Sequence, residues 1–145
     1  MNANLFAQLE RSIIDPAKTA ITTPTNDTVS YADLVALSGR LANVLTARGV
    51  KPGDRVAVQV EKSVPALVLY LATVRAGAVY LPLNTAYTLA ELEYFIGDAE
   101  PSFVVCDPAK RDGIERLAAK VGAAVETLDA TGQGTLMDAA INASE

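Results

Sequence analysis

Hydrophobic positions recur along this chain with two alternating periods, one typical of helices and one typical of strands. Leu34 and Leu41 lie on one face of a helix that Ser30 opens, because a hydroxyl followed three residues later by an acid is a capping box. Thr88 and Glu91 repeat this signal further along. The pattern predicts helices over 5–13, 31–48, 64–74, 89–98 and 114–121, and a short C-terminal helix after 134.

Short apolar runs between these helices predict strands, which cover 55–60, 79–83, 103–106 and 123–128. Thr19–Thr23 and Thr28–Ser30 flank the turn-forming segment Pro24–Asp27, so we expect a hairpin after the first helix. Strands and helices alternate beyond it. We therefore expect one α/β domain, with a mostly parallel sheet, flanking helices, right-handed crossovers and a short N-terminal hairpin.

The segment 64–74 differs from the other predicted helices because it is apolar almost all round. Ser63 is placed to cap it, and Pro65 lies in its first turn, where proline is tolerated. We expect this helix to be buried on more than one face.

The composition is typical of a folded domain, since 50% of the 145 residues are hydrophobic and 20% are charged. Twelve basic and seventeen acidic residues give a net charge of −5, and no run of Lys or Arg could follow a phosphate backbone, so nucleic acid is not an expected partner. The sequence contains no apolar run of about 18 residues, so we expect no membrane span. Its start, Met1–Leu5, does not resemble a signal peptide, and the expected location is the cytoplasm.

The chemistry available to the chain is limited, because it has no histidine and a single cysteine. The commonest general base and the commonest metal ligand are therefore missing. Cys106 ends an apolar run and is interpreted as a small buried hydrophobe. Ser63 has no base to activate it, and Thr131–Thr135 lacks the Lys and hydroxyl that end a phosphate loop. We expect no catalytic residue and no metal ligand within this chain.

Polar residues follow the strand 79–83, where Asn84 and Tyr87 precede the next helix. Ligands of parallel α/β sheets bind beyond the carboxyl ends of the strands, and this loop lies at such an end. Two interpretations stay open: these residues line a small-molecule pocket, or they form an ordinary connection between strand and helix. Glu61–Ser63 follows the neighbouring strand in the same way.

Motifs spread over nearly the whole chain resemble those of a known family. They are Tyr31–Leu34, Arg40–Ala42, Gly49–Ala57, Arg75–Val79, Pro82–Asn84, Thr88–Leu92 and Asp98–Pro101. In this order they are similar to the N-terminal portion of the AMP-forming acyl-CoA synthetases, which belong to the adenylate-forming superfamily. Within that family, Glu61–Gly77 and Leu81–Thr88 most resemble malonyl-CoA synthetases.

The resemblance implies an enzyme in which a substrate carboxylate attacks ATP, forms an acyl-adenylate and pyrophosphate, and passes the acyl group to the thiol of coenzyme A. Its implied cofactors are ATP, magnesium and coenzyme A. The family's phosphate loop, ribose-binding Asp and C-terminal lysine have no counterpart up to Glu145. We therefore expect 1–145 to be a partial N-terminal subdomain that is inactive alone and binds no cofactor by itself. Asn84 and Tyr87 are implied at the rim of the acyl or pantetheine tunnel.

The same resemblance implies the partners. They are the remainder of the synthetase chain, a small-molecule carboxylate and coenzyme A. Without a second sheet, part of the apolar helix 64–74 should face water as a patch of roughly several hundred Å², so we expect the isolated chain to self-associate. The alternative is a non-catalytic binding or assembly module that uses the same fold.

Overall fold

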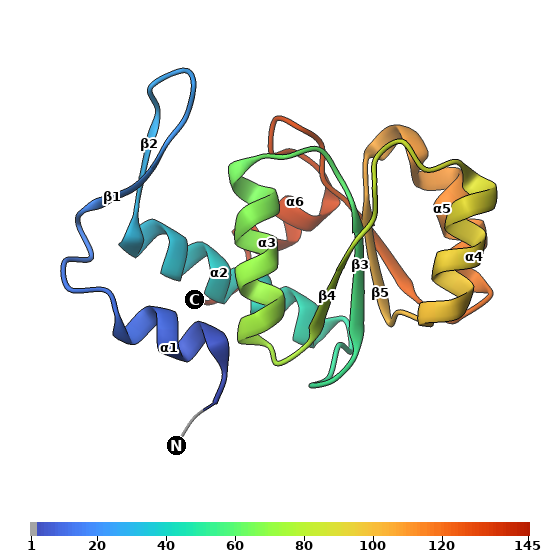
Figure 1. Ribbon diagram of the computed structural model, residues 1–145, viewed down its shortest axis with the longest axis horizontal. Helices are drawn as coiled ribbons and strands as arrows, with labels where there is room; N and C mark the ends of the chain where they lie inside the picture. Colours follow the sequence, from blue (N-terminus) through green and yellow to red (C-terminus); the bar gives the residue numbers. More distant parts are fainter. Residues whose placement is uncertain (1–2) are drawn as a thin grey trace.

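A four-stranded parallel sheet, with strand order β4-β3-β5-β6, forms the centre of the computed structural model, which describes residues 3–145 (Figure 1). Val56 of β3 pairs with Phe103 of β5 and with Tyr80 of β4. The strands are rich in valine, whose branched side chain packs well on a pleated surface. They are β3 (Arg55–Gln59), β4 (Val79–Pro82), β5 (Phe103–Cys106) and β6 (Ala124–Thr127).

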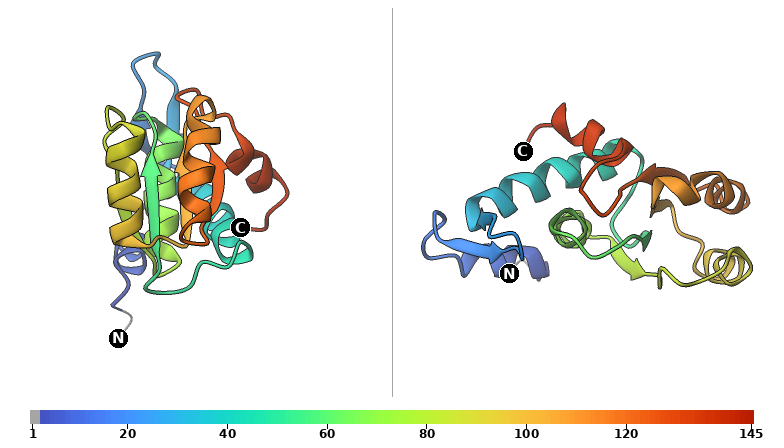
Figure 2. Two further views of the ribbon diagram at one scale, coloured as in Figure 1. Left: turned by 90° about the vertical axis from the view of Figure 1, so that its right-hand side faces the viewer. Right: turned by 90° about the horizontal axis from the view of Figure 1, so that it is seen from above.

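Helices cover both faces of this sheet, since side chains along a strand point alternately to either side. Val56 and Val58 pack with α2 (Tyr31–Ala47), α3 (Val64–Arg75) and α6 (Thr135–Ile141). Ala57 packs on the other face with α4 (Leu89–Ala99) and α5 (Arg111–Ala119). Figure 1 shows α3 and α6 on one side of the sheet and α4 and α5 on the other, and Figure 2 shows the same layers from two further sides. The predicted α/β class and parallel sheet are confirmed.

Two helices begin with the capping boxes that the sequence predicts. The hydroxyl of Ser30 accepts from the backbone N–H of Asp33, whose carboxylate accepts from the backbone N–H of Ser30 at 2.9 Å. Thr88 and Glu91 make the same reciprocal pair at the start of α4. The hydroxyl of Ser30 also donates to the Asp33 carboxylate, and together with the backbone N–H of Ser30 it favours the charged form and lowers the pKa of Asp33. The backbone N–H and the hydroxyl of Thr88 lower the pKa of Glu91 in the same way.

The helix α3 is buried on several sides, as its composition predicts. Its start is capped by Ser63, whose hydroxyl accepts from the backbone N–H of Ala66 at 3.2 Å. Val68, Leu69 and Ala72 are fully buried, and the helix contacts α1, α2 and β4. Leu67 is 44% exposed, so one side of α3 faces solvent.

The first helix is shorter than its hydrophobic spacing predicts. α1 covers Leu5–Arg11 and ends before Ile13. The hydroxyl of Ser12 donates to the carbonyl of Gln8 at 3.0 Å, and such side-chain bonds compete with the helical ladder. The hairpin that follows, β1 (Thr19–Thr22) with β2 (Thr28–Ser30), is antiparallel as expected. The segment before α5 also differs, since η1 (Pro108–Lys110) is a 3₁₀ turn that the pattern did not predict.

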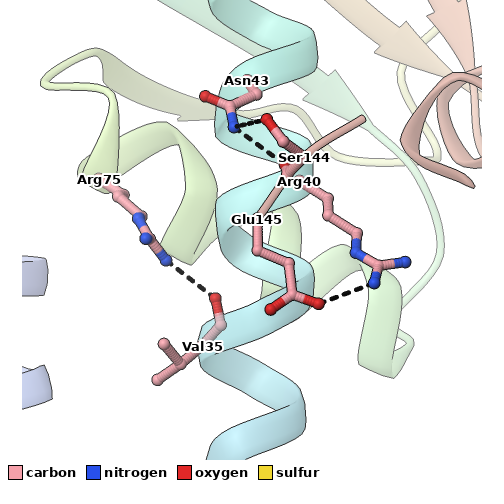
Figure 3. Close-up of polar contacts among 6 residues, drawn as sticks. All are labelled: Val35, Arg40, Asn43, Arg75, Ser144 and Glu145. Carbon is pink, nitrogen blue, oxygen red and sulfur yellow. Dashed lines mark hydrogen bonds and ion pairs between the residues drawn. The ribbon is translucent and has the colours of Figure 1, made fainter. Parts of the chain in front are cut away.

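The C-terminal segment lies along α2, as Figure 3 shows. Asn43 donates from Nδ2 to the carbonyl of Ser144 at 2.9 Å, and Arg40 pairs with Glu145 at 2.7 Å. This close approach explains a glycine in the middle of a helix, because a Cβ on Gly39 would lie 2.9 Å from a backbone carbon of Glu145.

Candidate functional site

An open groove of about 800 Å³ lies between α3 and the carboxyl ends of β3 and β4. This is the place where parallel α/β sheets bind ligands. Its floor is apolar, and polar residues of two loops surround its mouth. The lining residues that matter here are Val58, Val60, Lys62, Tyr70, Tyr80 and Asn84.

Two tyrosines pack together within this groove. The rings of Tyr70 and Tyr80 meet edge to face, with 5.3 Å between their centroids. Desolvation by burial raises the pKa of the Tyr80 phenol, which keeps it protonated. Glu61 and Lys62 stay exposed at the mouth, while the hydroxyl of Ser63 is used by the cap of α3. Ser63 is therefore a cap, as the sequence predicts.

The loop between β4 and α4 forms one side of the groove. Asn84 lines the groove, and its Oδ1 accepts from the backbone N–H of Ala86 at 2.9 Å. The carbonyl of Asn84 accepts from the backbone N–H of Tyr87 at 3.0 Å, which closes a tight turn. Thr85 between them also lines the groove. The turn therefore presents the first two of its residues to the groove.

Tyr87 lies on the other side of the same turn. Its ring stacks on Phe95 of α4 with 4.8 Å between centroids and packs against the apolar cluster beneath α4 and α5. Its side chain is half-buried and is not part of the groove lining. Asn84 and Tyr87 therefore lie in one loop, but of these two residues only Asn84 lines the groove.

A buried amide that the sequence analysis did not single out holds this loop. Gln59, at the end of β3, is 1% exposed. Its Nε2 donates to the carbonyl of Asn84 at 2.8 Å and to the carbonyl of Tyr87 at 3.4 Å. The sequence carries a signal for it, since Gln59 is an amide between two valines of a buried strand.

A lysine in η1, the turn after β5, makes a further hydrogen bond to this loop. Lys110 donates from Nζ to the carbonyl of Thr85 at 2.6 Å. The two residues are 25 positions apart, and no local pattern links them. Thr85 follows β4 and Lys110 follows β5, and these two loops come together because both strands pair with β3 in one parallel sheet.

Other reactive groups do not form a site. Cys106 is fully buried, and desolvation raises the pKa of its thiol to about 11, so it is the inert hydrophobe that its position predicts. Within residues 3–145, no three His, Cys, Asp or Glu side chains are grouped so that they could hold a metal ion. No helix in the described part of the chain is both long and apolar enough to cross a membrane.

A second groove, of about 570 Å³, lies between α1, α2 and α3 and is mostly apolar, although Glu10, Asp15 and Lys18 also line it. Phe6, Leu34 and Leu71 form its walls. Ile14 stands at its edge and is 99% exposed. Exposed aliphatic surface of this kind is typical of a contact with another part of a protein.

Known proteins share this fold and much of this sequence. A protein family described as AMP-binding enzyme matches residues 10–144. The solved structure of apo MatB from Rhodopseudomonas palustris is 69% identical, with a TM-score of 0.97, over 99% of this chain and 29% of the MatB chain. The same values hold for the ATP-bound structure of MatB from that organism.

Two curated relatives match over shorter stretches. The long-chain-fatty-acid–CoA ligase FadD13 of Mycobacterium tuberculosis is 34% identical over 97 residues, which are 66% of this chain and 19% of the ligase. Malpinin synthetase of Mortierella alpina is 39% identical over 106 residues, 72% of this chain and 1% of the synthetase. The chain thus spans less than a third of each of these three proteins.

Proposed function

Because this chain belongs to the AMP-binding enzyme family, we propose that it is the N-terminal part of an AMP-forming acyl-CoA synthetase that acts on malonate. The observation that carries the proposal is the match to the malonyl-CoA synthetase MatB, at 69% identity over 99% of the chain. The sequence blocks that resemble malonyl-CoA synthetases form α3, β4 and the loop after β4, which are the walls of the groove. The cytoplasm stays the expected location.

The role that we assign to these residues is to shape a binding wall. Asn84 lines the groove at the carboxyl end of β4, and Tyr87 anchors the other side of the same turn against Phe95. We propose both as the rim of the tunnel for the acyl group or pantetheine. The described lining of the groove holds no histidine and no cysteine, and the role that we assign to it is to orient a ligand.

We propose ATP, magnesium and coenzyme A as the cofactors of the whole synthetase. The ATP-bound MatB structure supports the use of ATP. Among the residues that the structure describes, no three His, Cys, Asp or Glu side chains are grouped so that they could hold a metal ion. The family's phosphate loop also has no counterpart in this sequence. The reacting phosphates and the metal are therefore assigned to other parts of the synthetase, and the chain alone is expected to be inactive.

A chimera tests the proposal. Residues 1–145 replace the matching segment of Rhodopseudomonas palustris MatB, and malonate-dependent release of pyrophosphate from ATP is measured. We expect a rate within about tenfold of MatB itself, which is ~1.4 kcal/mol of activation free energy, because the two segments share their fold and 69% of their residues. A chimera that melts as cooperatively as MatB and still releases no pyrophosphate contradicts the proposal. That result would favour the binding module.

The choice of malonate has its own test in the synthetase that carries this chain. With ATP and coenzyme A present, kcat/KM is compared for malonate, acetate and a long-chain fatty acid. We expect malonate to be preferred by at least about tenfold, which is ~1.4 kcal/mol of transition-state binding. Preference for either monocarboxylate contradicts the assignment and keeps only the ligase class.

We also propose that the isolated chain self-associates through its apolar surface. Ile14 and Leu67 are exposed, and the apolar groove beside α1 has no covering segment within residues 3–145. In the whole synthetase, the remainder of the chain is the partner that we assign to this surface. When it is missing, a second copy can bury the same side chains.

A further inference from the structure

We propose that Gln59 is a positioning residue for the turn Asn84–Tyr87, and that it sets the place of Asn84 on the groove wall. The inference rests on the proposed function, since it assigns a role at the same groove. Gln59 would act through the loop and not by touching a ligand.

The hydrogen bonds meet at a single carbonyl. The oxygen of Asn84 accepts from the backbone N–H of Tyr87 at 3.0 Å, which closes the turn, and from Nε2 of Gln59 at 2.8 Å. The second Nε2 contact, to the carbonyl of Tyr87 at 3.4 Å, holds the far end of the turn. One amide thus grips both ends of the loop. A fully buried strand residue is a stiff support for it, because its rotamer is fixed by packing.

The position of Gln59 in β3 excludes direct contact with the groove. Val58 and Val60 line the groove, and Gln59 lies between them on the strand. Side chains of a strand alternate between its faces, so Gln59 points to the opposite side, beneath the loop. Its effect on anything in the groove must therefore pass through Asn84.

The donor end of the amide carries this role. Nε2 supplies both N–H groups to carbonyls, while Oε1 has no hydrogen-bond partner within residues 3–145. A buried acceptor without a partner is costly, and methionine of similar length would remove that cost. If this position needed only to fill buried volume, an apolar side chain would serve. We therefore assign the amide to the two carbonyls that it holds. Lys110 reinforces the loop from the other side through the carbonyl of Thr85.

Hydrogen exchange of this chain tests the hold on the loop. Gln59→Met removes both donors and keeps the length of the side chain. Thr73→Val is the matched control, because it removes a fully buried hydroxyl that donates to the carbonyl of Leu69 within α3 and not to the loop. We expect the amides of Ala86 and Tyr87 to exchange about tenfold faster in Gln59→Met than in Thr73→Val, the effect of losing one net hydrogen bond. Equal exchange in the two variants would overturn the proposal.

A second variant covers the case in which Gln59→Met does not fold. Gln59→Asn keeps an amide but shortens its reach, and it is expected to speed exchange of the same two amides. Lys110→Met should speed exchange at the loop as well, though less, because Lys110 is only half-buried. If Gln59→Asn folds and leaves the loop as protected as in the unchanged chain, the proposal is wrong.

Kinetics of the whole synthetase separate a positioning role from a structural one. We expect Gln59→Met to raise KM for coenzyme A or malonate about tenfold, with KM for ATP unchanged. Simple loss of folded enzyme would lower the apparent kcat and leave every KM as it was. Faster loop exchange with no change in KM for coenzyme A or malonate would overturn the positioning role. Failure of the proposed function is distinct, because there the unchanged synthetase itself would show no malonate-dependent activity.

Discussion

Gly134 is explained by the close approach of two backbone segments, which the sequence alone does not reveal. Gly134 precedes α6 with φ 140° and ψ 173°, a region that only glycine adopts readily. A Cβ there would lie 2.3 Å from the carbonyl oxygen of Thr127. Thr127 and Thr135 exchange hydrogen bonds across this contact, each hydroxyl accepting from the other's backbone N–H at 2.9 and 3.0 Å. Gly134 therefore lets the chain enter α6 in close contact with Thr127.

This contact predicts the cost of a methyl group. Gly134→Ala is expected to destabilise the chain by about 3 kcal/mol, from backbone strain and the clash with Thr127 together. Gly122→Ala is the control: φ there is also positive, at 71°, but no atom lies within 4 Å of the added carbon. Its cost should be about 1 kcal/mol. Urea unfolding followed by circular dichroism measures both, and equal losses would contradict the clash.

Capping boxes fix where two of the helices begin, and the one at the start of α4 also affects the pKa of an acid. The carboxylate of Glu91 accepts from the backbone N–H of Thr88 at 2.8 Å and from its hydroxyl at 3.0 Å. The backbone bond is the larger cause of the lowered pKa of Glu91. A carboxyl whose folded pKa lies below its unfolded value stabilises the fold above that unfolded value, and this contribution is lost as the pH falls through the folded pKa.

The cap therefore predicts a pH dependence. Glu91→Gln keeps an acceptor but cannot titrate. The free energy of unfolding is measured for the unchanged chain and for Glu91→Gln from about pH 7 to about pH 3. Because the ordinary pKa of Glu is 4.5 and the folded value is lower, the advantage of the unchanged chain should be constant above pH 4.5 and shrink below it. A difference that grows as the pH falls would show the opposite sign and contradict the cap.

The sequence predicts the elements better than it predicts their contacts. The capping boxes at Ser30 and Thr88 are local signals, and both helices begin where these signals place them. α1 ends earlier than predicted for two reasons. Ser12 donates its hydroxyl to the carbonyl of Gln8, and Phe6 is the one buried side chain of α1, so little packing supports a further turn. The hydrogen bond from Lys110 to Thr85 depends on the order β4-β3-β5 in the sheet, which no local pattern contains.

The sequence predicts where the candidate site lies but not how each of its side chains is oriented. The rule for carboxyl ends of strands leads to Asn84, which lines the groove. It cannot tell which way a loop residue points, and Tyr87 turns to Phe95. The roles of both at a tunnel rim stay predictions.

The whole molecule is a sheet between two layers of helices, with an N-terminal segment that extends beyond these layers. α2, α3 and α6 cover one face and α4 and α5 the other, but α1 and the hairpin β1–β2 extend from the edge of these layers (Figure 1). Ile14, in the segment between α1 and the hairpin, is 99% exposed. Aliphatic side chains of this kind are normally buried against a neighbour.

Sedimentation velocity tests the expected self-association. At high micromolar concentration the chain should sediment as a dimer or larger species, because burial of exposed aliphatic groups contributes roughly 25 cal/mol per Å². Ile14→Ser should shift the distribution toward monomer, while Thr25→Ser, at the polar tip of the hairpin, should leave it unchanged. A clean monomer of the unchanged chain, with no binding of a hydrophobic dye, would contradict self-association.

The central claim is that residues 1–145 build a wall of a ligase and lack the groups that handle a triphosphate. The most direct measurement is pyrophosphate release from ATP by this chain alone, in the presence of malonate, magnesium and coenzyme A. We expect no release above the rate of a sample without protein. Malonate-dependent release that rises in proportion to the concentration of the chain would contradict the claim.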